Sequence, residues 1–290
     1  MDNTPLVSVC MITYKQEAYI GKAIESVLMQ QTDFPIELVI GEDASPDGTL
    51  RICQHYQALH PDKIRLMTGE KNMGFSWNFA RTLWATRGEY IALLEGDDYW
   101  TDPLKLQKQV DFLRKSPDFN LHFHNAHLLK QGAIDGQVYP AGRKETITIS
   151  DVLQHDYTQT CTVMIRAYPL RAIPEAACFD WVFNDITLFA LALSDGSKGQ
   201  YSPELMAAYR VHEGGVWSMA SLRRKYSMSR SAEDILISKY GTRPTLRRLI
   251  AKREMQFYYY YSKEMLKHGE LRLLAGTLGR LVLWSLKRWL

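Results

Sequence analysis

The chain has 290 residues, 46% of them hydrophobic, with 35 lysines and arginines against 32 acidic residues. A chain of this length and composition can bury a large core, which excludes a disordered polypeptide and a small disulfide scaffold. Its four cysteines are widely separated, which favours buried thiols in a reducing compartment: Cys10, Cys53, Cys161 and Cys178. The amino terminus does not resemble a signal peptide, and no segment reaches the roughly 20 apolar residues of a membrane span. We therefore expect a cytoplasmic protein.

Charge is distributed unevenly along the chain. Residues 222–290 contain 16 basic and 5 acidic side chains, a net charge of +11, whereas residues 1–221 carry −8. We therefore predict a main domain over 1–221 and a basic helical extension over 222–290. A basic extension favours an anionic surface as its partner.

The first half of the chain alternates between apolar strand patterns and amphipathic helix patterns. We predict strands at 6–12, 36–40, 63–68 and 90–94. One helix is predicted from Ile20 to Leu28 and another through Leu59, with Asp47 or Thr49 as its cap; two more are predicted from 76 to 85 and from Pro103 to Arg114. This order predicts a parallel sheet with right-handed crossovers. Strands near 121–129, 160–165 and 205–211 and a helix at 184–193 follow, while the polar insertion 131–157 yields no ordered prediction.

The strand at 90–94 runs directly into an acidic turn, Glu95-Gly96-Asp97-Asp98. Ligands of open α/β sheets bind at the carboxyl ends of strands, where this turn is expected. Three carboxylates in four residues repel one another unless a cation or hydrogen-bond donors hold them. A divalent metal that bridges substrate phosphates meets that need, and a solvated acidic turn is the alternative.

Several common enzyme motifs are absent. The turn after the first strand, at residues 13–17, has no glycine, which argues against a dinucleotide-binding fold. The sequence also lacks a phosphate-binding P-loop, a Gly-x-Ser-x-Gly elbow and a His-Glu-x-x-His motif. These absences weaken the dehydrogenase, NTPase, hydrolase and metalloprotease interpretations.

Four ordered motifs carry a family resemblance: Val7-Ser8-Val9, residues 42–49, Asn72-Met73-Gly74 with Asn78, and residues 88–98. Together they closely resemble the inverting family 2 glycosyltransferases of GT-A fold. The resemblance is strong over about the first 100 residues and weaker at Asn184-Asp185 and at 209–215. It implies a Rossmann-like mixed α/β sheet flanked by helices, with a nucleotide-sugar-binding half (1–100), an acceptor half (101–221) and the C-terminal helical extension.

The resemblance also implies a donor site. Asp43 is expected to accept a hydrogen bond from the nucleotide base, and Tyr14 to pack on that base, which suits uracil. Thr13, Asn72 and Gly96 are further donor-side residues. The alternatives are a turn or helix-cap role for Asp43 and core packing for Tyr14.

By the same resemblance, Glu95-Gly96-Asp97 corresponds to the family's Asp-x-Asp motif. The first acid is expected to contact ribose, and Asp97 to bind Mg²⁺ or Mn²⁺ across the two phosphates. Glu95 departs from the usual Asp, which puts its contact in doubt. His212 is expected to reach the metal or diphosphate, and Asp98 to hold the loop or face the acceptor.

Inverting transfer requires a base, for which Asp185 is the candidate and Asp180 the rival; a helix-start acid is the alternative for Asp185. Trp181 is an acceptor-sugar platform or a buried core residue. His122 and His124 share a strand face and are expected to be structural or acceptor-side.

The end of the chain, 270–290, predicts an amphipathic helix whose apolar stripe contains Leu271, Leu274, Ala275, Leu278, Val282, Leu286 and Trp289. It suits either peripheral binding to anionic lipid at the cytoplasmic face of the membrane or docking on protein.

The expected activity is metal-dependent transfer of a hexose from a nucleotide-diphosphate sugar, UDP-linked, to a saccharide or lipid-linked acceptor, as in polysaccharide biosynthesis. No nucleic-acid partner is expected. A nucleotidyltransferase that forms nucleotide sugars and a non-catalytic carbohydrate-binding protein of the same fold are the alternatives.

Overall fold

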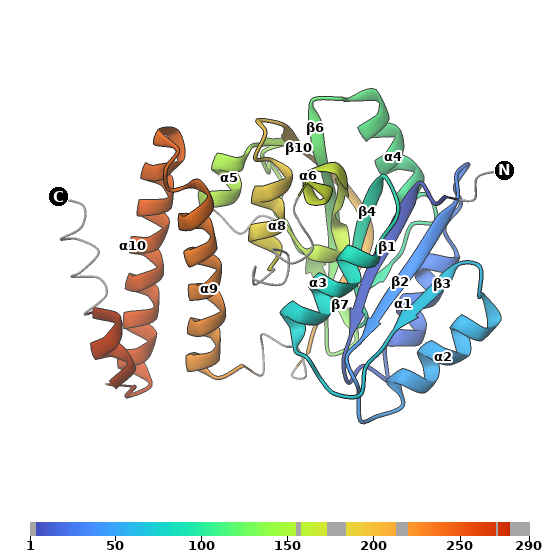
Figure 1. The fold of residues 1–290 in the computed structure, drawn as a ribbon, viewed down its shortest axis with the longest axis horizontal. Helices are drawn as coiled ribbons and strands as arrows, with labels where there is room; N and C mark the ends of the chain where they lie inside the picture. Colours follow the sequence, from blue (N-terminus) through green and yellow to red (C-terminus); the bar gives the residue numbers. More distant parts are fainter. Residues whose placement is uncertain (1–3, 155–157, 173–183, 213–219, 271, 279–290) are drawn as a thin grey trace. The chain divides into compact units, whose positions relative to one another are not determined.

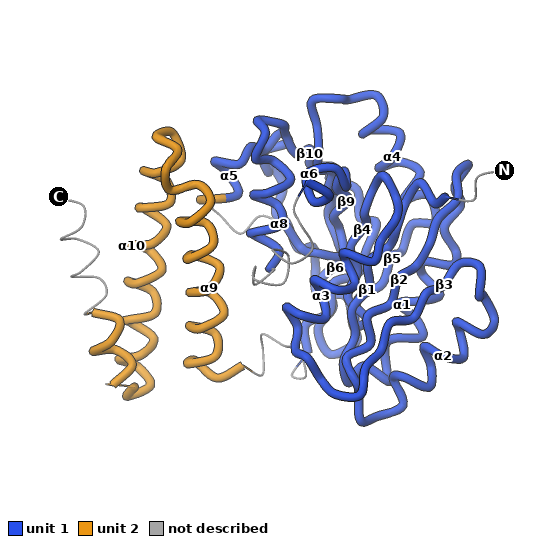
Figure 2. Tube along the Cα trace, in the orientation of Figure 1, with its two compact units in different colours: residues 1–152, 157–212 blue, residues 153–156, 213–290 orange. Residues whose placement is uncertain are grey.

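The computed structural model describes residues 4–154, 158–172, 184–212, 220–270 and 272–278 (Figure 1). The chain divides into two compact units (Figure 2). Unit 1 comprises residues 1–152 and 157–212, and unit 2 comprises residues 153–156 and 213–290. The first helix described in the long segment of unit 2 begins at Leu222.

Unit 1 is built around a ten-stranded sheet with strand order β3-β2-β1-β4-β9-β6-β10-β5, in which β7 pairs with β6 and β8 with β10. The strands are β1 (Val7–Thr13), β2 (Ile36–Glu42), β3 (Ile64–Met67), β4 (Tyr90–Glu95), β5 (Tyr99–Trp100), β6 (Phe119–Lys130), β7 (Ala133–Gln137), β8 (Thr146–Ile147), β9 (Met164–Arg166) and β10 (Lys198–Val211). The helices are α1 (Ile20–Leu28), α2 (Thr49–Leu59), α3 (Phe75–Ala85), α4 (Lys105–Lys115), α5 (Ile149–Gln154), α6 (Tyr168–Arg171) and α8 (Asp185–Ala192), with a 3-10 turn η1 (Thr160–Thr162).

The sheet is mixed, as predicted. Strands β3, β2, β1 and β4 are parallel. Strand β9 then runs antiparallel to both β4 and β6, while β10 is parallel to β6 and antiparallel to β5 and β8. In the parallel half, Ile12 lies beside Glu95 and Thr13 beside Glu42, so the carboxyl ends of β1, β2 and β4 meet at one edge.

Alternation along the strands decides which helices cover which face. Val7, Val9 and Met11 of β1 pack into a fully buried cluster with apolar side chains of α1, α2 and α4. Helix α3 covers the opposite face, where its Thr82 approaches β2 closely. A Cβ on Gly41 would lie 1.9 Å from the Thr82 hydroxyl oxygen, so this position accepts only glycine.

The predicted cap of one helix and the predicted start of another differ from the structure. Helix α2 has Gly48 as its N-cap. Asp47, the residue before this cap, accepts the Thr49 N–H at 3.1 Å. Helix α4 begins at Lys105 rather than at Pro103, because Asp102 accepts the Leu104 N–H at 2.8 Å and holds a turn before the helix. The insertion 131–157, for which no order was predicted, contains β7, β8 and α5.

In unit 2, α9 (Leu222–Tyr240) and α10 (Pro244–Lys267) pack through an aromatic cluster, and residues 272–278 are also helical. The cluster consists of Tyr226, Phe257, Tyr258, Tyr261 and Met265. Much of the apolar stripe predicted for 270–290 lies outside the described residues. Among the residues that are described, no helix is both long enough and apolar enough to cross a membrane.

Candidate functional site

The acidic turn predicted as the site centre leaves β4 at the carboxyl edge of the sheet. Gly96 donates its N–H to the Ile12 carbonyl at 3.0 Å, which presses the turn against the end of β1. A Cβ at Gly96 would lie 2.5 Å from Gln16 Oε1 and 2.8 Å from Thr13 Oγ1. Glycine therefore allows the β1 and β4 ends to approach closely, and it sets the positions of the carboxylates on either side.

Asp97 and His212 meet across this edge. His212 Nε2 lies 2.9 Å from Asp97 Oδ2, and both side chains are partly exposed. His212 follows the end of β10, so two segments separated by 115 residues supply the pair. A carboxylate and an imidazole are both ligands for divalent metals. In the described part of the chain, no group of three or more His, Cys, Asp or Glu side chains could hold a metal.

Asp98 is buried and faces β10. Its carboxylate accepts the backbone N–H of Arg210 at 2.7 Å and a hydrogen bond from the Cys161 thiol. Burial, reinforced by the charges of Asp97 and Glu95, raises the pKa of Asp98 well above its usual range. Asp98 thus ties the acidic turn to the strand that leads to His212.

Glu95 interacts electrostatically with Asp97 and with Asp185 at the start of α8. Burial is the main cause that raises its pKa, to about 8, and the charges of Asp97 and Asp185 add to the effect, whereas a hydrogen bond with Thr160 opposes it. Asp185 therefore lies within electrostatic range of Glu95. It is the first residue of α8, which Asn184 caps by accepting the Thr187 N–H at 3.0 Å. Asp180 and Trp181 lie outside the described residues.

The predicted donor residues line the loops after β1 and β2. Tyr14 is exposed, at 38%, whereas Thr13 is buried and donates to Gln16. Asp43 is also buried, and its two carboxylate oxygens accept the N–H groups of Met73 and Gly74 at 2.8 and 2.9 Å.

Asn72 donates to the Asp43 carbonyl at 3.0 Å, so the segment at 72–74 is held to the loop after β2. Asp43 therefore stabilises a turn through its carboxylate, which is one of the alternatives given for it in the sequence analysis. Each carboxylate oxygen has two lone pairs, so these bonds leave acceptor capacity for a nucleotide base.

Sequence reasoning missed two residues beside the site, Arg210 and Tyr19. Arg210 Nε donates to the Asp97 carbonyl at 2.9 Å, and its guanidinium lies 4.5 Å from the Tyr19 ring centroid. The Tyr19 ring also contacts the His212 ring, with centroids 5.2 Å apart. Arg210 stands two residues before His212 in the sequence, and this spacing along a strand was the signal that it shares the same face.

Sequence reasoning also missed the structural importance of Glu42. It is fully buried at the end of β2 and accepts hydrogen bonds from Ala44 N–H, Ser45 N–H and the Thr68 hydroxyl. Glu42 therefore shapes the loop that carries Asp43. No periodic pattern distinguishes it from its acidic neighbour.

His122 and His124 are buried in β6, away from solvent. Burial and the nearby Lys105 charge lower the pKa of His122 to about 3 and that of His124 well below its usual range. His122 Nδ1 lies 3.2 Å from Gln109 Nε2, a contact within the protein interior. Both side chains are therefore neutral parts of the core.

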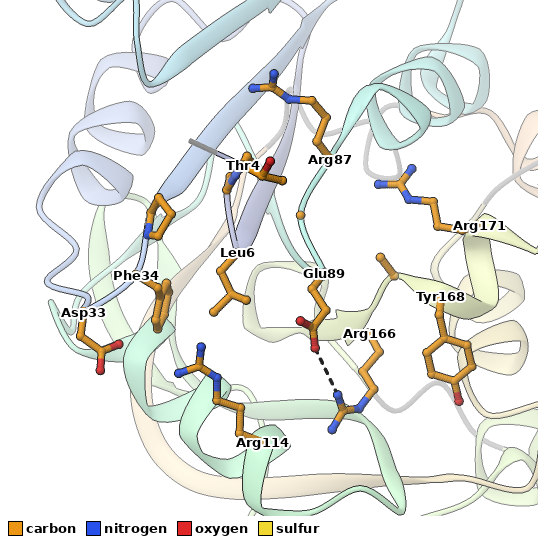
Figure 3. Close-up of a pocket in the computed structure, with 14 residues that line it drawn as sticks. Thr4, Leu6, Asp33, Phe34, Arg87, Glu89, Arg114, Arg166, Tyr168 and Arg171 are labelled. Atoms are coloured by element: carbon orange, nitrogen blue, oxygen red, sulfur yellow. Dashed lines mark ion pairs between the residues drawn. The ribbon is translucent and has the colours of Figure 1, made fainter. Parts of the chain in front are cut away.

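A separate pocket lies at the amino-terminal ends of β1 and β4, the sheet edge opposite the acidic turn (Figure 3). Four of its 14 lining residues are arginines, and three of these arginines hydrogen-bond to other residues of the protein. Arg87 pairs with Glu37 at 2.8 Å, Arg166 donates to the Phe119 carbonyl at 3.1 Å, and Arg171 donates to Thr86. These arginines fix the surrounding loops, and none of the sequence-predicted site residues lines this pocket.

Comparison with known proteins shows the family and the fold that this chain resembles. A family model described as glycosyl transferase family 2 matches residues 8–168, more than half of the chain. An uncharacterized protein of Mycobacterium tuberculosis is 38% identical over 224 residues, which cover 76% of this chain and 63% of that protein. The chain thus spans less than two thirds of this relative.

Two solved structures share the fold. The Staphylococcus aureus TarS fragment 1–349 in complex with UDP-GlcNAc superposes with a TM-score of 0.61 at 19% identity, covering 87% of this chain and 80% of that one. The mannosyltransferase PcManGT of Pyrobaculum calidifontis, in complex with GDP-Man and Mn²⁺, gives a TM-score of 0.59 at 15% identity, covering 99% and 81%. The fold predicted from the sequence is confirmed.

Proposed function

Because the chain belongs to glycosyl transferase family 2, we propose that it transfers a sugar from a UDP-linked donor to a saccharide or lipid-linked saccharide acceptor, with inversion at the anomeric carbon. The observation that carries this proposal is the contact between Asp97 and His212, at 2.9 Å, beside Glu95 and Asp185 at the carboxyl edge of the sheet. Carboxylates and an imidazole gathered at this edge suit a nucleotide diphosphate bound through a metal ion.

The residues present fit a divalent metal. Asp97 and His212 provide one oxygen and one nitrogen ligand, both partly exposed, and the donor diphosphate would supply further oxygens. Asp97 and His212 would hold Mg²⁺ or Mn²⁺, which would supply positive charge to offset the negative charge on the departing nucleoside diphosphate. The Mn²⁺ complex of PcManGT supports this choice of metal.

The base of the donor is proposed to bind between Tyr14 and Asp43. The exposed Tyr14 ring offers a flat apolar face, and the Asp43 carboxylate is already fixed by Met73 and Gly74. A fixed acceptor recognises an N–H of the base without first losing conformational freedom. The UDP-GlcNAc complex of TarS supports a uridine donor, and the GDP-Man complex of PcManGT makes guanosine the competing choice.

Asp185 is proposed as the base that takes the proton of the acceptor hydroxyl. In a single displacement, the acceptor oxygen forms the new bond to the anomeric carbon while the bond to the diphosphate breaks. The proton passes to the Asp185 carboxylate. The capping box at Asn184 and Thr187 fixes the first turn of α8 and so limits the directions in which Asp185 can point.

The test is release of nucleoside diphosphate from UDP-, GDP- and dTDP-sugars, measured with Mn²⁺ and with EDTA. We expect metal-dependent release from one donor, lost in Asp97→Ala and in Asp185→Asn but retained in Asp111→Asn, which changes a remote acid on α4. NMR of the product would show inverted anomeric configuration. Failure of every donor to bind would refute the proposal, and metal-dependent binding without turnover under any acceptor would favour a carbohydrate-binding role.

A further inference from the structure

Helix α10 has one face buried in unit 2 and one face exposed. The buried face contributes Phe257, Tyr258, Tyr261 and Met265 to the aromatic cluster. We define the outer face of α10 as six exposed residues at successive three- and four-residue spacings: Arg248, Lys252, Met255, Tyr259, Lys263 and Leu266. Residues at these spacings lie along one side of a helix.

The outer face combines apolar and basic side chains. Met255, Tyr259 and Leu266 are 51%, 73% and 61% exposed. The three basic residues of the face make no ion pair or hydrogen bond with the described part of the chain. From Arg248 to Leu266 the face extends about 27 Å at the rise of an α-helix.

The acidic residues of α10 do not offset this charge. Glu254 is buried and pairs with Arg230 at 3.2 Å, and Glu264 pairs with Lys267 at 2.6 Å. In α9, Glu233 pairs with Arg253 at 2.6 Å. Glu264 also interacts electrostatically with Lys263, but the outer face itself carries three cations and no acidic side chain.

We propose that the outer face of α10 binds an anionic phospholipid surface, with the helix lying in the plane of the interface. Its apolar side chains would enter the boundary between headgroups and acyl chains, where the amphipathic tyrosine ring is favoured. The basic side chains would meet the lipid phosphates. A second copy of the same face is disfavoured, because a symmetric pair would set its cations against one another.

This inference goes beyond the proposed transferase activity, and each can fail without the other. Vesicle binding requires no donor or turnover, and the outer face contains none of the residues assigned to the donor site. A protein held at a lipid surface would be well placed for a lipid-linked acceptor, which connects the two.

The test is co-sedimentation of the full chain with vesicles of phosphatidylcholine alone or mixed with phosphatidylglycerol. We expect binding only to the anionic vesicles, and a roughly fivefold weaker partition for each lysine neutralised in Lys252→Gln and Lys263→Gln. Tyr259→Ser and Leu266→Ser should weaken it further. The matched controls in unit 1 are Arg51→Gln, which removes an exposed cation, and Leu59→Ser, which removes a leucine that is 58% exposed.

Far-UV circular dichroism and donor turnover should be unchanged in the outer-face variants. Unchanged values would show that these variants fold. Equal vesicle binding by these variants and the wild type would overturn the proposal. So would a dimer, measured by light scattering, that the variants dissociate, because the face would then be a protein contact.

Discussion

His212 Nε2 lies 2.9 Å from Asp97 Oδ2, and this contact joins the end of β10 to the turn after β4. The family resemblance predicts Asp97 as a metal ligand from the acidic motif and His212 as a residue that reaches the metal or diphosphate from the motif around Arg210. Their contact brings the two predicted residues together at one point of the structure. It also means that anything that displaces β10 displaces a proposed ligand.

His212→Ala is expected to raise the Mn²⁺ concentration for half-maximal donor turnover by about tenfold or more, because one of the two proposed protein ligands is lost. The measurement is a Mn²⁺ titration of nucleoside diphosphate release. His55→Ala, which removes an exposed histidine of α2, is the control. An unchanged titration curve for His212→Ala would show that His212 does not act on the metal.

We expect Asp98 to be a positioning residue. The loss of stability on its substitution should depend on the residue that replaces it. Asp98→Ala leaves the Arg210 N–H without its acceptor at a buried site, so we expect the free energy of unfolding to fall by about 1–3 kcal/mol. Because the raised pKa of Asp98 favours its neutral form, Asp98→Asn should keep most of the stability. Urea denaturation measures the first effect.

Asp98→Ala and Asp98→Asn should also differ in kcat. Displacement of β10 in Asp98→Ala moves His212, so kcat should drop and the Mn²⁺ requirement should rise, whereas Asp98→Asn should stay close to wild type in both. Equal stability and kinetics in the two variants would rule out the tie between the acidic turn and β10.

The parallel half of unit 1 could be predicted because its information is local. Apolar runs such as that of β4 and the helical stripe of α1 are visible in short windows of sequence, and their alternation gives the crossovers. The acidic turn could be placed at the carboxyl edge for the same reason.

In the other half, strands near 121–129, 160–165 and 205–211 were predicted, but residues 160–162 form the 3-10 turn η1 instead, and the pairing of the strands could not be predicted in this way. Strand β10 pairs with β6 over about 80 residues of separation, with register shifts near Ser202 and Leu205 that no local pattern encodes. The partners of Asp98, namely Arg210 and Cys161, come from that half. The sequence therefore indicates which acids form the site but not what holds them.

Gly96→Ala tests the close approach of β1 and β4. Its Cβ would fall 2.5 Å from Gln16 Oε1 and 2.9 Å from Ile20 Cδ1, so the turn or these side chains must shift. Overpacking of this kind typically costs about 1–3 kcal/mol, and we expect a lower melting temperature and weaker donor binding by calorimetry. Gly276→Ala, where nothing lies within 4 Å of the added methyl, is the matched control and should be neutral or slightly stabilising. A Gly96→Ala protein with wild-type stability and affinity would contradict the geometry.

Burial of Lys105 should make the stability of the protein depend on pH. It is completely buried in α4, where Nζ donates to Gln109 Oε1 at 2.7 Å and lies 4.0 Å from the Trp100 ring centroid. Burial lowers its pKa to about 7. In the unfolded chain a lysine titrates near 10.4, so between these values the unfolded state binds a proton that the folded state does not. The contribution of Lys105 to stability therefore rises with pH across this window.

Lys105→Met removes this titration while keeping similar volume. Between pH 7.5 and pH 9.0, the wild type should gain about 1–2 kcal/mol in free energy of unfolding relative to the variant, because each pH unit inside the window is worth up to about 1.4 kcal/mol. Urea denaturation of both proteins at the two pH values measures the difference, and Lys63→Met removes an exposed lysine as the matched control. Below pH 7 the two stabilities should run parallel as far as this side chain is concerned, because Lys105 is then protonated in both states. Parallel curves from pH 7.5 to 9.0 would instead show that Lys105 remains charged in its buried position, held by Gln109 and the Trp100 ring.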